Sequence, residues 1–264
     1  MEETPSFTTL LLAVDGTVAT VTLNRPDVGN TMNLAMRAEL VSCFEWIRQN
    51  RTLKVVVVAG AGEHFCMGAD ARDFIGADHE ALHDLMRHTS QRWFAGLWQL
   101  PQITIAAVNG VAAGGGANMV LACDFAVASE HARFGETFVR LGLIPDLGGL
   151  FLLPRIVGFQ RARRMCLTGE VLGAEEAAAL GLFGRVVRHD DLADTVTALA
   201  ADLATRPATT VAVMKAILAR SFESSMESTM LFELLGQSFM FSTQEHRAAL
   251  SAFFDRHESA ASHE

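Results

Sequence analysis

Three consecutive glycines, at 114–116, lie where a predicted buried strand, 103–108, passes into a predicted helix. The first main-chain N–H groups of a helix have no helical acceptor, and they lie at the positive end of the helix dipole. Because glycine carries no Cβ, this backbone can approach an anionic oxygen closely. The chemistry predicted for the segment is stabilisation of negative charge by main-chain donors.

A second glycine turn lies upstream, after another predicted strand. Gly68 and Ala69 follow residues 54–58 and would place further free N–H groups beside a pocket. Either turn alone is also explained by ordinary turn chemistry, since glycine often follows a strand. Two such turns after consecutive core strands indicate an oxyanion hole for a developing enolate oxygen.

One carboxylate, Asp146, has apolar neighbours in Ile144, Pro145 and Leu147. Burial among them would raise its pKa towards a value suited to proton transfer. The residues equally allow a second interpretation, in which Asp146 caps a helix that begins near Gly148.

These segments are expected to be positioned by alternating strands and helices. The hydrophobic periodicity predicts strands at 10–14, 18–23, 54–58 and 103–108, and helices at 32–49 and within 79–100. Thr31 or Asn33 is available to cap the first helix. This alternation favours an α/β fold with parallel strands covered on both faces. From residue 158 onward the pattern is helical, and the apolar positions of the last helices need a surface to pack against.

Composition narrows the class of protein. The 264 residues are 50% hydrophobic with a formal net charge of −9, which argues against nucleic acid or an anionic membrane as partner. Glycines and polar residues within 103–128 argue against a bilayer span, and the acidic start is no signal peptide. The four cysteines share no close spacing, so we expect no disulfide, no metal site and a reduced, cytoplasmic setting.

Residues 65–70, 106–116 and 143–149 resemble the crotonase, or enoyl-CoA hydratase/isomerase, superfamily. The resemblance runs in order from about residue 10 to residue 254. It implies a spiral of β-β-α units, with residues 1–200 forming the core that holds the acyl-CoA site. Residues 201–264 are then a C-terminal helical region that assembles a homotrimer or a dimer of trimers.

The resemblance also implies roles for individual residues. The main-chain N–H groups of Ala69 and Gly115 would bind the thioester oxygen, and Asp146 would be the acid/base. Hydratases of the family carry two glutamates at the positions of Asn118 and Phe138, and neither residue here exchanges a proton at neutral pH. Glu136 is near in sequence but is expected to point elsewhere.

The remaining residues assigned by resemblance line the substrate. Asn118, Phe138, Met67 and Gly114 are expected to shape the acyl pocket, and Cys66, Asp70 and Arg256 to bind CoA. Arg256 is equally explained as a plain surface arginine. No metal or separate cofactor is implied, since CoA is part of the substrate.

Together these features predict an acyl-CoA isomerase that shifts a double bond, or rearranges a ring epoxide, through an enolate. The pattern is most similar to the 1,2-epoxyphenylacetyl-CoA isomerase branch of the family, which belongs to phenylacetate catabolism, beside the enoyl-CoA isomerases of fatty acid metabolism. Two alternatives stay open: an enoyl-CoA hydratase with unusual acid/base residues, and a non-catalytic acyl-CoA-binding homologue.

Overall fold

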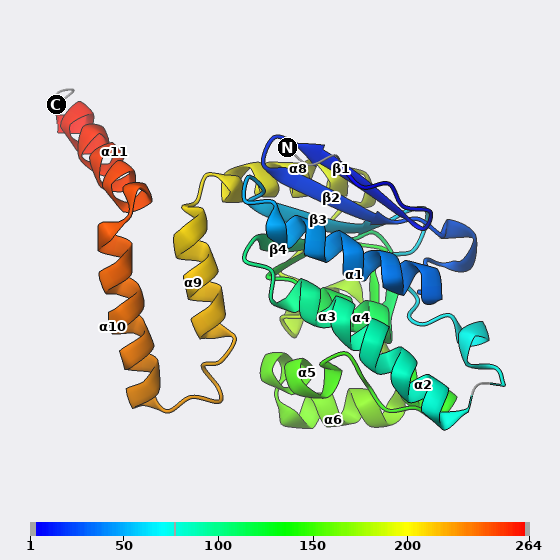
Figure 1. Ribbon diagram of the computed structural model, residues 1–264. Coiled ribbons are helices and arrows are strands. Elements are labelled where there is room, and N and C mark those ends of the chain that lie inside the picture. Colours follow the sequence, from blue (N-terminus) through cyan, green and yellow to red (C-terminus); the bar gives the residue numbers. More distant parts are fainter. Residues whose placement is uncertain (1–3, 77, 262–264) are drawn as a thin grey trace. The chain divides into compact units, whose positions relative to one another are not determined.

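The computed structural model describes residues 4–76 and 78–261, with the backbone alone described for 255–261. The chain divides into two compact units, Met1–Ala204 and Thr205–Glu264. Both β-sheets belong to the first unit, and the described part of the second is helical (Figure 1).

A six-stranded sheet forms the centre of the first unit. Its order is β1-β2-β3-β4-β6-β9; β1 and β2 pair antiparallel, and the other neighbours pair parallel. The bounds are β1 Leu10–Asp15, β2 Val18–Leu23, β3 Val55–Gly60, β4 Ile103–Val108, β6 Phe125–Ser129 and β9 Arg185–Val187. The predicted strands 18–23 and 103–108 are confirmed residue for residue. The strand predicted at 10–14 extends one residue further, and the strand predicted at 54–58 lies at 55–60.

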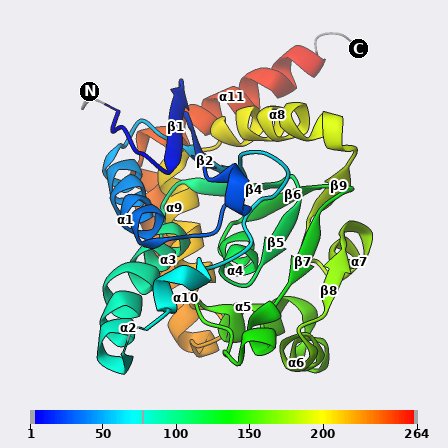
Figure 2. The same cartoon turned by 90° about the vertical axis from the view of Figure 1, so that its right-hand side faces the viewer.

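Helices cover both faces of this sheet, which explains the continuous apolar runs of β3 and β4. On one face, Val56 belongs to the same buried core as Leu40 of α1 (Leu34–Gln49). On the other face, α8 (Leu192–Ala204) packs across β2, β3, β4 and β6, and Val57 faces the same cavity as Val196 of α8. Figure 2 shows the sheet beside these helices.

A smaller sheet is formed by strands that follow strands of the larger sheet in the chain. It consists of β5 (Val111–Ala113), β7 (Arg133–Gly135) and β8 (Val171–Gly173), with β5 parallel and β8 antiparallel to β7. The chain passes from β4 to β5 and again from β6 to β7, and α4 (Gly115–Leu121) follows the first of these pairs. This is the spiral of β-β-α units that the resemblance implies.

The helical interpretation after residue 158 is incomplete. Further helices of the first unit are α5 Gly149–Val157, α6 Phe159–Thr168 and α7 Ala174–Ala179, with short 3-10 helices at Pro26–Val28, Ala71–Phe74, Thr137–Leu141 and His189–Asp191. However, the strands β8 and β9 interrupt them. Strands of three residues are too short to show a recognisable alternation of apolar and polar positions.

Helix boundaries follow from local capping. The helix predicted from residue 32 begins at Leu34, because the Asn33 side chain accepts the N–H of Met36 at 3.0 Å. The helical segment expected within 79–100 contains α2 (His79–Leu85), one π-helical turn (Met86–Ser90) and α3 (Gln91–Trp98). Among the described residues, no helix is both long and apolar enough to cross a membrane.

The second unit contains α9 (Ala208–Leu218), α10 (Met226–Ser242) and α11 (Gln244–Ala261). Its helices α9 and α10 pack closely, since a Cβ on Gly236 would lie 3.3 Å from Val213. Many apolar side chains of α10 nevertheless remain exposed, among them Leu231, Leu234, Leu235, Phe239 and Phe241.

Candidate active site

The two glycine turns lie against each other in the folded chain. The segment after β3 is held to β5, because Cys66 N donates to Val111 O at 3.0 Å and Ala113 N donates to Cys66 O at 2.9 Å. Gly68 adopts φ +100°, and a Cβ there would lie 3.0 Å from Ala113 O and 3.5 Å from Gly115 N. Only glycine allows this approach without strain.

Two main-chain donors are left free at this junction. Met32 N donates to Gly68 O and Asp70 N donates to Met32 O, so both neighbours of Ala69 are paired while its own N–H is not. Gly115 is the first residue of α4, where a helix has no acceptor for the N–H. Within the part of the chain that the structure describes, neither N–H group has a protein acceptor.

Ala69 and Gly115 both line a cavity of about 590 Å³. Its wall is mainly apolar and includes Phe74, Leu82, Met86, Trp93, Phe138 and Ile144, contributed by the segment 71–98 and by the loops on either side of Gly142. Its polar side chains are Arg37, Ser90 and Asp146. The cavity therefore combines free main-chain donors, an apolar wall and one acidic group.

Asp146 lines the cavity, and its side chain does not cap a helix. The helix α5 begins at Gly149, its N-cap residue is Gly148, and no side chain caps it. The main-chain oxygen of Asp146 accepts Gly149 N at 2.9 Å, and the carboxyl accepts the main-chain N–H of Asp146 itself. Burial raises the pKa of the carboxyl to about 6, while the positive charge of Arg37 acts in the opposite direction.

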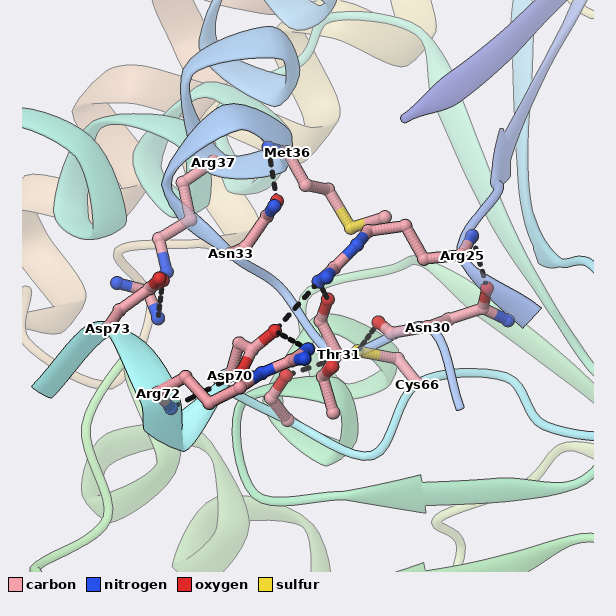
Figure 3. Close-up of polar contacts among 11 residues, drawn as sticks. Arg25, Asn30, Thr31, Asn33, Met36, Arg37, Cys66, Asp70, Arg72 and Asp73 are labelled. Carbon is pink, nitrogen blue, oxygen red and sulfur yellow. Dashed lines mark hydrogen bonds and ion pairs between the residues drawn. The ribbon is translucent and has the colours of Figure 1, made fainter. Parts of the chain in front are cut away.

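Arg37 is a part of the site that sequence reasoning did not find. It lies on α1 with 3% of its surface exposed and forms an ion pair with Asp73 at 3.7 Å (Figure 3). Its guanidinium lies over the Phe74 ring, 5.2 Å from the ring centroid. Its atom Nη2 is buried without a hydrogen-bond acceptor among the described residues. Burial lowers the pKa of Arg37, and the surrounding acids, Asp73 first, oppose that effect.

Comparison with known proteins decides the family. The Enoyl-CoA hydratase/isomerase family matches residues 13–261. The chain belongs to the enoyl-CoA hydratase/isomerase family. It is therefore related to acyl-CoA enzymes, and its two sheets and C-terminal helices are the crotonase fold.

Individual members of the enoyl-CoA hydratase/isomerase family differ in activity. A probable enoyl-CoA hydratase of Rhodobacter capsulatus is 34% identical over 95% of this chain and 96% of its own length. A 1,2-epoxyphenylacetyl-CoA isomerase of Escherichia coli is 35% identical over 92% of this chain and 94% of its own. A Thermobifida fusca structure, assigned as an enoyl-CoA hydratase in complex with CoA, is 32% identical with a TM-score of 0.83, covering 89% of this chain and 93% of its own.

At the two positions where the resemblance implies hydratase glutamates, this family member carries residues that do not titrate. Phe138 lines the cavity, and its ring lies 3.7 Å from where a Cβ on Gly114 would be. Asn118 is fully buried, and its Nδ2 donates to Asp146 O at 2.9 Å. Asn118 is not among the residues that line this cavity; it contacts the loop that carries Asp146 instead.

Glu136 does not line the cavity, yet it lies within electrostatic reach of Asp146. Its side chain is fully buried and interacts electrostatically with Asn118 and Asp146. Burial raises the pKa of Glu136 to about 8, and the charge of Asp146 adds to that effect. The position of Glu136 follows from the local backbone, because β7 ends at Gly135 and Glu136 is the N-cap of the 3-10 helix Thr137–Leu141.

Three of the predicted binding residues lie outside the cavity wall. Cys66 is fully buried and does not line the cavity, its thiol donates to Asn30 O at 3.2 Å, and burial raises its pKa to about 12. Met67 packs against Gly29 and is half exposed. Gly114 acts through its main chain, since its N–H donates to Gly135 O at 2.9 Å.

Asp70 pairs with two arginines instead of facing the cavity. Its carboxyl contacts Arg25 at 3.1 Å and Arg72 at 2.6 Å, and it caps the 3-10 helix Ala71–Phe74 (Figure 3). These donors hold the pKa of Asp70 well below its usual range.

The side chain of Arg256 lies outside the described residues. Among those described, no group of three or more His, Cys, Asp or Glu side chains could hold a metal ion.

Proposed function

We propose that this protein is an acyl-CoA isomerase that moves a double bond through an enolate. The proposal depends on one observation: of the described residues that line the cavity, Asp146 alone carries a carboxyl group. Hydration requires an acid and a base on opposite sides of a water molecule. Moving a proton between two carbons requires one group that first accepts and then returns it.

The first step uses the free main-chain donors. A thioester carbonyl placed between Ala69 and Gly115 accepts hydrogen bonds from both N–H groups. These bonds strengthen as the oxygen becomes negative, so they stabilise the enolate more than the ground state. The helix dipole of α4 acts in the same direction at Gly115.

The second step uses Asp146. Its carboxylate takes a proton from the α carbon of a 3-enoyl thioester, and the electron pair spreads onto the thioester oxygen as a dienolate. The same carboxyl then gives its proton to the γ carbon, which yields the conjugated 2-enoyl thioester. The reaction consumes no water and no electrons. Phe138, as a cavity wall, disfavours water beside the intermediate.

Within the family, we propose that the chain belongs to the branch of 1,2-epoxyphenylacetyl-CoA isomerases and enoyl-CoA isomerases. The E. coli relative supports it, and so does the aromatic part of the cavity wall, Phe74, Trp93 and Phe138. A ring-containing acyl group would pack well against these rings. Rearrangement of a ring epoxide and a simple double-bond shift are both compatible with a single carboxyl group.

We further assign the cytoplasm as the compartment, a core at 1–200 that binds acyl-CoA, and assembly by residues 201–264 as a homotrimer or a dimer of trimers. Cys43, Cys66 and Cys166 form no disulfide in the part of the chain that the structure describes, which supports a reducing compartment. The exposed apolar residues of α10 support assembly.

A hydratase is the second candidate, because the structure brings a second carboxyl, Glu136, within electrostatic reach of Asp146. Against it, Glu136 is fully buried and contributes nothing to the cavity wall. A non-catalytic acyl-CoA-binding protein is the third candidate, and it would bind a thioester without exchanging protons.

One experiment separates the three. The protein is incubated in D₂O with a 3-enoyl-CoA and, separately, with a 2-enoyl-CoA, and the products are followed by mass spectrometry and NMR. An isomerase converts the first into the second and incorporates deuterium at the α or γ carbon. A hydratase forms the 3-hydroxyacyl-CoA. Binding without either product identifies a non-catalytic homologue and rejects our proposal.

A further inference from the structure

A group of buried acceptor atoms lies behind the Asp146 loop. Glu136 Oε1, Glu136 Oε2 and Asn118 Oδ1 are all buried, and none has a hydrogen-bond partner among the described residues. If Glu136 were ionised, these three atoms would all be acceptors. Leaving buried polar atoms unpaired costs about 1–3 kcal/mol each, and more for a charge. The arrangement lacks a donor.

A proton on Glu136 supplies that donor. A neutral carboxyl has an O–H group that can donate to Asn118 Oδ1. The charge of Asp146 favours this form by raising the pKa of Glu136, whereas the Asn118 side chain lowers that pKa. The Cys166 thiol on α6 also interacts with Glu136, and its own pKa is raised by burial and by the charge of Glu136. Burial, the largest effect, raises the pKa of Glu136 to about 8.

The same cluster connects the two halves of the proposed site. Asn118 Nδ2 donates to Asp146 O at 2.9 Å, which fastens the Asp146 loop to α4. Gly135, next to Glu136, accepts the N–H of Gly114, the residue before the Gly115 donor. Glu136 therefore lies where a single side chain can fix the distance between the carboxyl group and the oxyanion hole.

We infer that Glu136 is a protonated positioning residue that donates a hydrogen bond to Asn118 and so holds Asp146 against α4. Loss of its proton removes that donor and places a second negative charge beside Asp146, which loosens the loop. The catalytic consequence rests on the isomerase function proposed above. The protonation of Glu136 and its hydrogen bond to Asn118 do not depend on that function.

The kinetic test compares Glu136→Gln with Glu136→Ala. The Gln amide donates to Asn118 Oδ1 at every pH, whereas Ala removes the donor. In the wild-type protein we expect turnover to fall as pH rises above about 8. Glu136→Gln should lose this fall, and Glu136→Ala should have about tenfold lower turnover at all pH values with little change in KM. Glu175→Gln, an exposed residue of α7, is the matched control.

Two kinetic results would overturn the inference. If Glu136→Gln keeps the wild-type fall above pH 8, Glu136 is not the group that titrates. If Glu136→Gln loses about a hundredfold or more at every pH, Glu136 transfers a proton itself and is no positioning residue.

A stability measurement tests the inference even if no isomerase activity is found. A folded-state pKa raised from 4.5 to about 8 means that the native state binds the proton more tightly than the unfolded chain. The stability from this group is therefore complete below about pH 4.5 and is lost as pH rises to about 8. The Tm of Glu136→Gln minus that of wild type should increase over this range, also in an Asp146→Asn background. A difference that does not change with pH would refute the protonated Glu136.

Discussion

The guanidinium of Arg37 and the carboxyl of Asp146 line one cavity from distant parts of the chain, α1 and the loop before α5. Burial raises the pKa of Asp146 to about 6, and the charge of Arg37 keeps it from rising further. The carboxyl is therefore ionised at neutral pH yet basic enough to accept a proton from carbon. A proton-transfer group works best when its pKa lies near the working pH.

The first prediction concerns the acidic side of the pH profile. We expect kcat/KM for double-bond isomerisation to fall below about pH 6, because protonated Asp146 cannot accept a proton. Arg37→Gln should move this fall to higher pH, since burial then raises the pKa of Asp146 without opposition. The measurement is kcat/KM between about pH 5 and pH 9.

Arg37→Lys is the control for that shift, because it keeps the positive charge near Asp73 and Asp146. Thermal unfolding of both variants is measured in parallel, since Arg37→Gln leaves Asp73 without its ion pair. A folded Arg37→Gln protein with an unchanged pH profile would contradict the electrostatic role given to Arg37.

The second prediction is that Asp146 is the acid/base. Asp146→Asn keeps the size of the side chain and removes the proton site, so turnover should fall by about 10²–10⁴-fold with little change in acyl-CoA affinity. Steady-state kinetics and calorimetric binding measure the two quantities. Asp194→Asn on the exposed side of α8 is the control.

Other outcomes would assign Asp146 differently. If Asp146→Asn retains nearly full activity while Glu136→Gln loses it, the segment around Glu136 carries the chemistry. If affinity and stability decrease together with activity, Asp146 has a structural role only.

Sequence reasoning predicted those parts of the fold that depend on local pattern. The strands 18–23 and 103–108 and the cap Asn33 were accessible because alternation and capping are local properties. The two glycine turns, at Gly68 and at 114–116, were accessible because each follows a buried strand, and neighbouring parallel strands end at the same edge of a sheet. The choice of Ala69 and Gly115 as the donors comes from the family resemblance and remains a proposal.

The rest of the site depends on contacts between segments distant in sequence. Arg37 lies within a regular amphipathic helix, and nothing in its neighbourhood signals that Asp146, more than a hundred positions later, faces it. The direction of Glu136 follows from the bend after Gly135, which a strand periodicity cannot show. Burial of Cys66 is likewise a tertiary effect, because Asn30 covers its thiol.

The third prediction is that hydration of a 2-enoyl-CoA is negligible. Phe138 and Asn118 provide no acid/base, and each missing group costs about 10²–10⁴-fold. Coupled detection of the 3-hydroxyacyl-CoA measures the rate beside isomerisation. Hydration at a rate ordinary for an enzyme would reject this prediction.

Restoring the two acids tests the same prediction, because hydration should then be gained rather than absent. Phe138→Glu places a carboxyl in the cavity wall. Asn118→Glu removes the amide that donates to Asp146 O and adds an acid beside Glu136, so it should destabilise the fold by about 1–3 kcal/mol. We expect the double variant to hydrate only if water also enters the pocket, and Phe138→Glu alone is the better-folded comparison.

The last prediction concerns assembly through the second unit. The exposed apolar residues of α10 are spread around the helix: Leu231, Leu235 and Phe239 follow each other at intervals of four, and Leu234 and Phe241 lie seven apart. A helix that is apolar on several sides is normally buried, so we expect a stable oligomer at micromolar concentration. Sedimentation velocity measures this, and a stable monomer would contradict it.

Leu234→Glu should dissociate the oligomer, whereas Gln237→Glu, which adds the same charge at an exposed polar position of α10, should not. Deletion of residues 226–264 should both abolish assembly and lower solubility.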